Sequence, residues 1–329
     1  MTEQQLVTQA RGADPGALVS TQPSMTSQTY ANASSAPNTR RAYRADWHDF
    51  TDWCAQAGRD ALPAAPVTVA DYLAASAAGE DGRPARAVAT LDRRLVAIAR
   101  AHQLAGYPSP TSDEWVRTVL KGIRRAHSAA QRRVAPIGVA VLRQAVAALP
   151  DSLLGLRDRA LLLLGFAAAL RRSELIGLDL DDIQAVPEGL ILRRSKTDQA
   201  GEGVLKGIPL GQCAATCPVR ALQAWIKAAG LRDGPLFRPI DRHSNVRPKH
   251  LNGSDVAVIV KRCVAAAGFD PDLYSGHSLR AGLATAAAGM GAPTYAIRKQ
   301  TGHKSDRMLE LYIREGSLFR DNVAGMVGL

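Results

Sequence analysis

The chain has 329 residues, of which 46% are hydrophobic, and its formal net charge is +11 at pH 7. This length predicts about two domains, and the apolar content is sufficient for a core in each. The basic excess favours a polyanionic partner, whereas an aromatic content of 5% argues against a surface that stacks single-stranded bases.

The four cysteines do not form a recognisable framework. Cys213 and Cys217 are spaced C-x3-C, but no second pair with zinc-site spacing follows, so we expect free thiols, no metal and no cofactor. The longest strongly apolar run, 160–170, is too short to span a bilayer, and no segment resembles a signal peptide. We expect a cytoplasmic, nucleoid-associated protein that does not contact a membrane.

The first part of the chain is predicted to be a tail followed by a helical bundle. Residues 1–35 are polar and lack helical periodicity, which is typical of disorder. Apolar residues then recur at helical spacing in four segments. We expect these helices to begin at Asn38, at Thr68, with Pro84 in a first turn, and at Ser112. The predicted bundle covers residues 36–127.

Basic residues are frequent on the faces of these helices opposite the apolar stripe. They indicate a domain that lays its helices on duplex DNA through phosphate contacts, although a solvated charged face is an equal alternative for any one of them. The stretch 126–137 interrupts the periodicity, and we place an interdomain linker at 128–136. The candidate DNA-binding residues of the bundle and linker are Arg40, Arg41, Arg44, Arg93, Arg94, Arg100, Lys121, Arg124, Arg125, Arg132 and Arg133.

The second domain, 137–329, is predicted to be mainly helical with a small antiparallel β-sheet. A helix over 138–149 precedes a continuously apolar helix over 156–170, which would hold Arg171 rigidly at its end. Residues 187–210 are expected to form strands, with Lys196 at the tip of a hairpin. Further on, His277 and Arg280 are three residues apart and so share one helix face.

Six residues of this domain form a set suited to breaking a phosphodiester without a metal. A planar guanidinium meets two phosphate oxygens at once, and preorganised positive donors stabilise the charge that develops on them. A phenol has a pKa of about 10 and attacks only when a base or a cationic field favours its anion. A lysine can protonate the leaving oxygen. The six residues are Arg171, Lys196, His277, Arg280, His303 and Tyr312.

Each of these motifs alone is weak evidence of function, but the order and spacing of all six residues together are specific. The chain resembles the tyrosine recombinase, or phage integrase, family, and within it the Cre- and Xer-like recombinases. The shared signature is Arg, Lys, His-x-x-Arg, His or Trp, then Tyr, and the resemblance covers residues 38–329. Glu174 matches the acidic residue that follows the first arginine, whereas Ala169 stands where the family often has glycine.

The resemblance implies a helical SAM-like core-binding domain joined to an α+β catalytic domain. It further implies a site-specific recombinase that acts through a 3'-phosphotyrosyl intermediate and a Holliday junction. Tyr312 would be the nucleophile, Arg171 and Arg280 the phosphate clamp, and Lys196 the general acid. The partner would be double-stranded DNA with a specific recombination site, bound by a tetramer on two DNA sites. A helix in 316–329 would dock on a neighbouring protomer, with packing back on its own domain as the alternative.

The sequence leaves two questions open and disfavours one further class of enzyme. Either His277 or His303 can be the proton acceptor for Tyr312. The alternatives to a recombinase are a type IB topoisomerase-like enzyme, disfavoured by the His-x-x-Arg element and the long helical domain, and a catalytically silent DNA-binding relative. A metal-dependent nuclease is disfavoured, since the only dense acidic run near the signature residues, 179–182, is expected to edge a turn.

Overall fold

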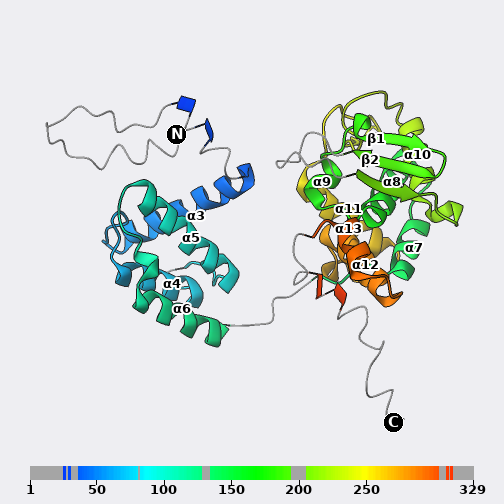
Figure 1. Ribbon diagram of the computed structural model, residues 1–329. Coiled ribbons are helices and arrows are strands. Elements are labelled where there is room, and N and C mark those ends of the chain that lie inside the picture. Colours follow the sequence, from blue (N-terminus) through cyan, green and yellow to red (C-terminus); the bar gives the residue numbers. More distant parts are fainter. Residues whose placement is uncertain are drawn as a thin grey trace, which may run out of the picture. The chain divides into compact units, whose positions relative to one another are not determined.

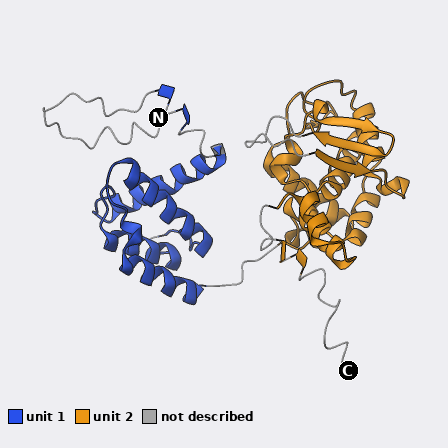
Figure 2. Cartoon of the chain, viewed as in Figure 1, with its two compact units in different colours: residues 1–132 blue, residues 133–329 orange. Residues whose placement is uncertain are grey.

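The computed structural model describes residues 25–26, 29–30, 36–80, 82–127, 134–193, 205–303, 309–310 and 312–313 (Figure 1). The chain divides into two compact units, residues 1–132 and 133–329 (Figure 2). The division falls within the stretch predicted to be a linker. Lys196, Arg132, Arg133 and the C-terminal segment 316–329 lie outside the described residues, as does most of the predicted tail. None of the helices in the described residues combines the length and the hydrophobicity that a membrane span requires.

The first unit is helical. Its elements are α3 (Pro37–Gln56), α4 (Pro66–Ala78), α5 (Val88–Leu104), the 3-10 turn η1 (Pro110–Ser112) and α6 (Glu114–His127). Two of these helices begin with a proline, whose fixed φ suits a first turn and whose missing N–H is not needed there. Their apolar faces enclose a core centred on Phe50, Tyr72 and Ile98.

Two predicted helix starts in this unit are wrong. The second helix begins at Pro66 rather than at Thr68, which is buried inside the helix. The third begins at Val88, so Pro84 precedes it, outside any helix or strand, and does not occupy its first turn. The start near Ser112 is confirmed, because α6 begins at Glu114 and the carboxylate of Asp113 accepts a hydrogen bond from the backbone N–H of Trp115 at 2.8 Å.

Ion pairs and a hydrogen bond join three helices of the first unit. Asp49 of α3 accepts a hydrogen bond from the Tyr72 hydroxyl at 2.7 Å and lies 2.9 Å from the guanidinium of Arg94. The neighbouring Asp46 binds Arg93 through two contacts of 2.6 and 2.9 Å. Arg94 is only 5% exposed. The expectation that Arg94 lies on an outer, DNA-facing surface is therefore wrong, since its guanidinium is buried against the carboxylates of α3.

The second unit combines helices with a three-stranded sheet. Its helices are α7 (Val139–Ala147), α8 (Leu153–Ala167), α9 (Arg172–Ile176), α10 (Pro218–Ala228), α11 (Gly253–Ala266), α12 (His277–Gly289) and α13 (Thr294–Thr301). Its 3-10 turns are η2 (Leu180–Asp182), η3 (Ala214–Thr216) and η4 (Pro271–Leu273). The architecture confirms the prediction of a mainly helical protein with a small antiparallel sheet.

The sheet is an antiparallel meander of β1 (Ile183–Val186), β2 (Gly189–Arg193) and β3 (Leu205–Pro209), in the order β1-β2-β3. Sequence reasoning missed β1, which has exposed residues at its centre and directly follows the acidic turn at 179–182. In the β2–β3 pair, Leu190 lies opposite Ile208 and Leu192 lies opposite Lys206. Lys206 and Ile208 are therefore two residues apart on the inner face of β3.

Helix α8 is the centre of the second unit. It packs against α10 and α12, and Leu161, Leu162 and Leu164 are fully buried, which confirms the prediction of a core helix. The helix ends at Ala167, earlier than expected. Arg171 is consequently not part of α8 but is the N-cap residue of the short helix α9.

Gly282 allows the start of the second unit to pack closely on α12. A Cβ atom at Gly282 would lie 2.1 Å from the carbonyl oxygen of Ile137, whose own N–H donates to Ser278 O. We predict that Gly282→Ala lowers the free energy of unfolding by about 1–3 kcal/mol, the usual cost of overpacking a core. Gly122→Ala is the control, because that helical glycine has no atom within 4 Å of an added Cβ and should gain about 0.5–1 kcal/mol. Equal denaturation midpoints for the two variants would contradict this account.

Candidate active site

The carbonyl groups at the end of α8 gather side chains from three other elements. The last carbonyls of a helix have no partner within the helix and must find one elsewhere. Here Ala167 O accepts from Gln300 Nε2 at 2.7 Å, Ala168 O accepts from Lys206 Nζ at 2.9 Å, and Ala169 O accepts from Arg280 Nη1 at 2.7 Å. The donors come from α13, β3 and α12. The end of α8 thus fixes the positions of these three elements relative to one another.

Ala169 has a positive φ of 47°, the left-handed conformation in which a side chain is disfavoured. This backbone turn directs the Ala169 carbonyl to the guanidinium of Arg280, which is 1% exposed. Ala169, which stands where the family often has glycine, therefore adopts a backbone conformation that glycine would adopt more easily. The turn also leads the chain directly to Arg171.

Arg171 is held by the carboxylate of Glu174. The backbone N–H of Arg171 donates to Glu174 Oε2 at 2.9 Å, and its Nη1 donates to Oε1 at 2.6 Å. The Glu174 side chain is 4% exposed, whereas that of Arg171 is 49% exposed. Nη2 of Arg171 also donates to Gly302 O at 3.4 Å. A buried anion thus restrains one edge of a guanidinium whose side chain stays open to solvent.

Tyr312 lies against both predicted histidines. Its hydroxyl is 2.7 Å from Nε2 of His277, the first residue of α12. The ring centroids of Tyr312 and His303 are 5.7 Å apart. With the His277 proton on Nδ1, the Nε2 lone pair accepts the hydrogen bond from the phenol. The geometry therefore places His277, rather than His303, next to the proton that a nucleophilic phenol must lose.

His303 is oriented by its neighbour Thr301. The Thr301 hydroxyl oxygen lies 2.8 Å from the backbone carbonyl of Ile297 and 2.8 Å from Nδ1 of His303. This contact restrains the His303 ring through the end of α13. Gly302, in the left-handed conformation at φ 66°, ends α13 and turns the chain into the site.

Both imidazoles are in an environment that favours the neutral ring. Desolvation, followed by the charges of Arg280 and Arg171, lowers the pKa of His277 below its ordinary 6.5. The same three causes lower the pKa of His303 to about 4, with smaller contributions from His277 and Lys206. At neutral pH the site therefore combines uncharged imidazoles with fixed cations, as expected of a site that receives an anion.

The structure brings together five of the six predicted catalytic residues and the supporting Glu174; the sixth, Lys196, is outside the described residues. Sequence reasoning missed Lys206, Gln300 and Thr301. A signal existed for Lys206, since it alternates with Ile208 along a strand and so shares its inward face. Gln300 and Thr301 lie in the last turn of α13 and carry no comparable signal.

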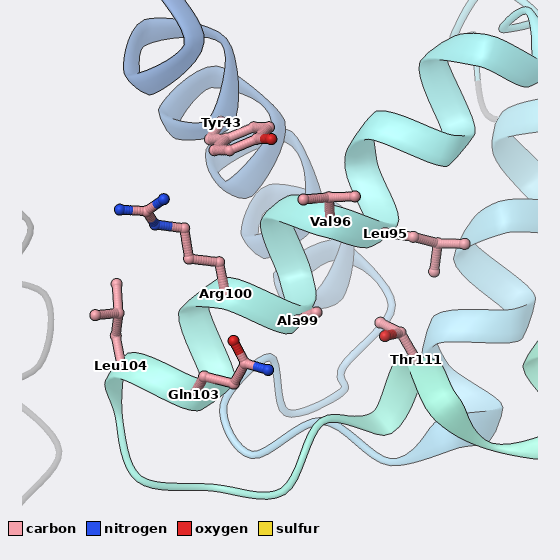
Figure 3. A pocket seen from close by; sticks show the side chains of 8 residues that line it. All are labelled: Tyr43, Leu95, Val96, Ala99, Arg100, Gln103, Leu104 and Thr111. Carbon is pink, nitrogen blue, oxygen red and sulfur yellow. The ribbon is translucent and has the colours of Figure 1, made fainter. Parts of the chain in front are cut away.

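The candidate DNA-binding residues of the first unit differ in exposure. Arg41, Arg44, Arg93, Lys121, Arg124 and Arg125 are exposed, although Arg93 pairs with Asp46 and Arg124 with Asp92. Arg40 is half-buried. Arg100, also half-buried, lines a groove of about 640 Å³ between α3 and α5, beside Tyr43 and Leu104 (Figure 3).

The lowered pKa of His303 predicts a pH dependence of stability. In the unfolded chain this histidine binds a proton near pH 6.5, whereas in the folded protein it does so only near pH 4. Because the unfolded state then binds more protons, the folded state loses stability as the pH falls from 6.5 towards 4. We predict a smaller loss in His303→Gln, measured as the melting temperature across this interval. Parallel curves for both proteins would contradict the prediction.

Comparison with known proteins identifies this arrangement. The sequence model described as "Phage integrase family" matches residues 138–317. An integrase/recombinase xerD homolog of Selenomonas ruminantium is 42% identical over 296 residues, which cover 88% of this chain and 85% of that protein. Recombinase cre of Escherichia phage P1 is 25% identical over 284 residues, covering 80% and 79%. The structure of a lambda integrase tetramer bound to a Holliday junction shares the fold, with a TM-score of 0.57 at 16% identity over 97% of this chain and 87% of that one. The chain therefore belongs to the phage integrase family of tyrosine recombinases, and it is an enzyme of site-specific DNA recombination.

Proposed function

We propose that the protein cleaves and rejoins duplex DNA through a covalent phosphodiester bond to Tyr312. The observation that carries this proposal is the 2.7 Å contact between the Tyr312 hydroxyl and a neutral His277, next to two arginines with restrained guanidiniums. A nucleophile, a base that orients it and a cationic cradle for the developing charge are the parts that such a transfer needs.

Arg171 and Arg280 form the phosphate clamp of this mechanism. Glu174 holds one side of Arg171, and the Ala169 carbonyl holds Nη1 of Arg280. Each guanidinium is preorganised, so little reorganisation is required when charge builds up on the non-bridging oxygens. The neutral histidines contribute no positive charge of their own before DNA binds.

The chemical step is a transesterification. The Tyr312 oxygen attacks the phosphorus and its proton passes to Nε2 of His277, while the bond between phosphorus and the 5'-oxygen breaks. Lys196 supplies the proton to that oxygen, which leaves a 3'-phosphotyrosyl bond and a free 5'-hydroxyl. A 5'-hydroxyl from a second duplex reverses the step. The phosphotyrosyl bond conserves the energy, so the strand is rejoined without a nucleotide cofactor.

The proposed partner is double-stranded DNA with a specific recombination site, exchanged through a Holliday junction within a tetramer on two DNA sites. The similarity in fold to a lambda integrase tetramer bound to a Holliday junction supports this assembly. The helical bundle 36–127 would bind the duplex with its exposed basic residues, and the segment 128–136 would link it to the catalytic domain 137–329. A helix in 316–329 would dock on the neighbouring protomer. Such a protein would associate with the nucleoid in the cytoplasm.

A covalent-trapping assay tests the nucleophile. We predict that the wild-type protein in EDTA forms a denaturation-resistant adduct with nicked duplexes drawn from DNA flanking the gene. Tyr312→Phe keeps the ring but loses the hydroxyl, so it should bind the same duplexes and form no adduct. An adduct in Tyr312→Phe would assign the nucleophile to another residue. Tight duplex binding without any wild-type adduct would favour a catalytically silent DNA-binding protein.

The pH dependence of adduct formation tests the proton acceptor. The acceptor must be neutral, so the wild-type rate should fall as the pH drops through the pKa of His277 in the DNA complex. We predict that His277→Gln lowers the single-turnover rate by about 10²–10⁴-fold and removes this acid limb. His303→Gln is the matched control and should retain the limb. The opposite pattern would identify His303 as the acceptor.

A further inference from the structure

Lys206 is a buried cation that the proposed mechanism leaves without a role. It lies on β3, opposite Leu192, and is 9% exposed. A lysine is rarely buried unless its charge has partners. The surroundings of its ammonium group therefore require an explanation within the fold or the reaction.

The ammonium group joins the ends of two helices. Nζ of Lys206 donates to Ala168 O at 2.9 Å and to Gln300 O at 2.6 Å. Ala168 is the C-cap residue of α8, and Gln300 lies in the last turn of α13. The C-terminal carbonyls of a helix carry partial negative charge, so a cation between two such ends stabilises both of them. Contacts of this kind, from a charged donor, are the stronger class of hydrogen bond.

These two helix ends carry the cationic and imidazole groups of the site. The segment after Ala168 contains Ala169, which binds Arg280, and then Arg171. The segment after Gln300 contains His303, and Gly302 O accepts from Arg171 at 3.4 Å. A shift of α13 away from α8 would therefore move His303 and disturb Arg171 in the same motion.

We propose that Lys206 is a positioning residue of the active site, which sets the distance between the end of α8 and the end of α13 and thereby holds His303 against the phosphate clamp. The inference rests on the proposed function, because it assumes that this clamp receives a phosphodiester. It also assigns different roles to Lys196 and Lys206. Lys196 delivers the proton to the leaving oxygen, whereas Lys206 directs its protons to backbone carbonyls.

A pair of substrates separates positioning from proton donation. The first is the duplex that gives the strongest adduct with wild type, and the second carries sulfur in place of the 5'-bridging oxygen. A thiolate leaves without being protonated, so the sulfur substrate does not need a general acid. We expect Lys206→Met to slow adduct formation about 10–100-fold on both substrates alike, as expected for a misplaced cradle. Lys196→Met should be slow on the oxygen substrate only.

Two further variants and one spectroscopic readout complete the experiment. Lys206→Arg keeps the positive charge and should recover part of the rate of adduct formation. If Lys206→Met fails to fold, Lys206→Arg is compared with wild type on the same two substrates. Lys227→Met, at an exposed position on α10, should match wild type. In labelled protein, loss of the Lys206 charge should raise the pKa of His303, which is measured by NMR titration.

The outcomes distinguish this inference from the proposed function. If wild type forms the adduct and Lys206→Met forms it equally fast, the positioning role is wrong while the recombinase mechanism stands. If the sulfur substrate alone rescues Lys206→Met, Lys206 is the proton donor and not a positioning residue. If wild type forms no adduct on any duplex, the proposed function itself fails.

Discussion

The catalytic half of this protein depends on how the C-terminal end of α8 satisfies its carbonyl groups. Leaving a buried carbonyl without a donor costs about 1–3 kcal/mol, and α8 ends inside the core, where water is scarce. Its three successive carbonyls are satisfied by Gln300, Lys206 and Arg280. A requirement of helix termination thus determines where α13, β3 and α12 meet, and the reactive groups lie at that meeting point.

Charge is arranged in this site so that each cation has a restraint and each imidazole stays neutral. Glu174 is a buried anion in contact with Arg171, and backbone carbonyls satisfy Lys206 and part of Arg280. The described part of the site therefore presents net positive charge, which depresses the pKa of His277 and His303. A phosphodiester would supply the missing negative charge. The same electrostatics keeps His277 neutral at neutral pH, as its proposed role as proton acceptor requires.

In the first unit, the basic residues divide between structure and surface. Asp46 and Asp49 of α3 bind the adjacent arginines of α5, and Arg94 is buried by this network. Its role is to join helices, because an arginine paired inside the bundle has no surface to offer a duplex. Arg44, Lys121 and Arg125 are exposed. Net charge alone overestimates the basic surface that such a domain can present to DNA.

Much of this site was predictable from the order of residue types along the chain, because phosphoryl chemistry requires guanidiniums, a base and a nucleophile whatever the fold. Arg171, His277, Arg280, His303 and Tyr312 follow from that requirement together with the family signature, and helix periodicity correctly placed His277 and Arg280 on one helix. The roles of Lys206, Gln300 and Thr301 did not follow. Each of these residues acts through a contact with an atom distant in sequence or with a neighbouring side chain. The packing of the helices determines which polar group reaches which carbonyl. The wrong prediction for Arg94 has the same cause. Local periodicity indicates which face of a helix a residue occupies, but not whether a carboxylate of another helix lies opposite it.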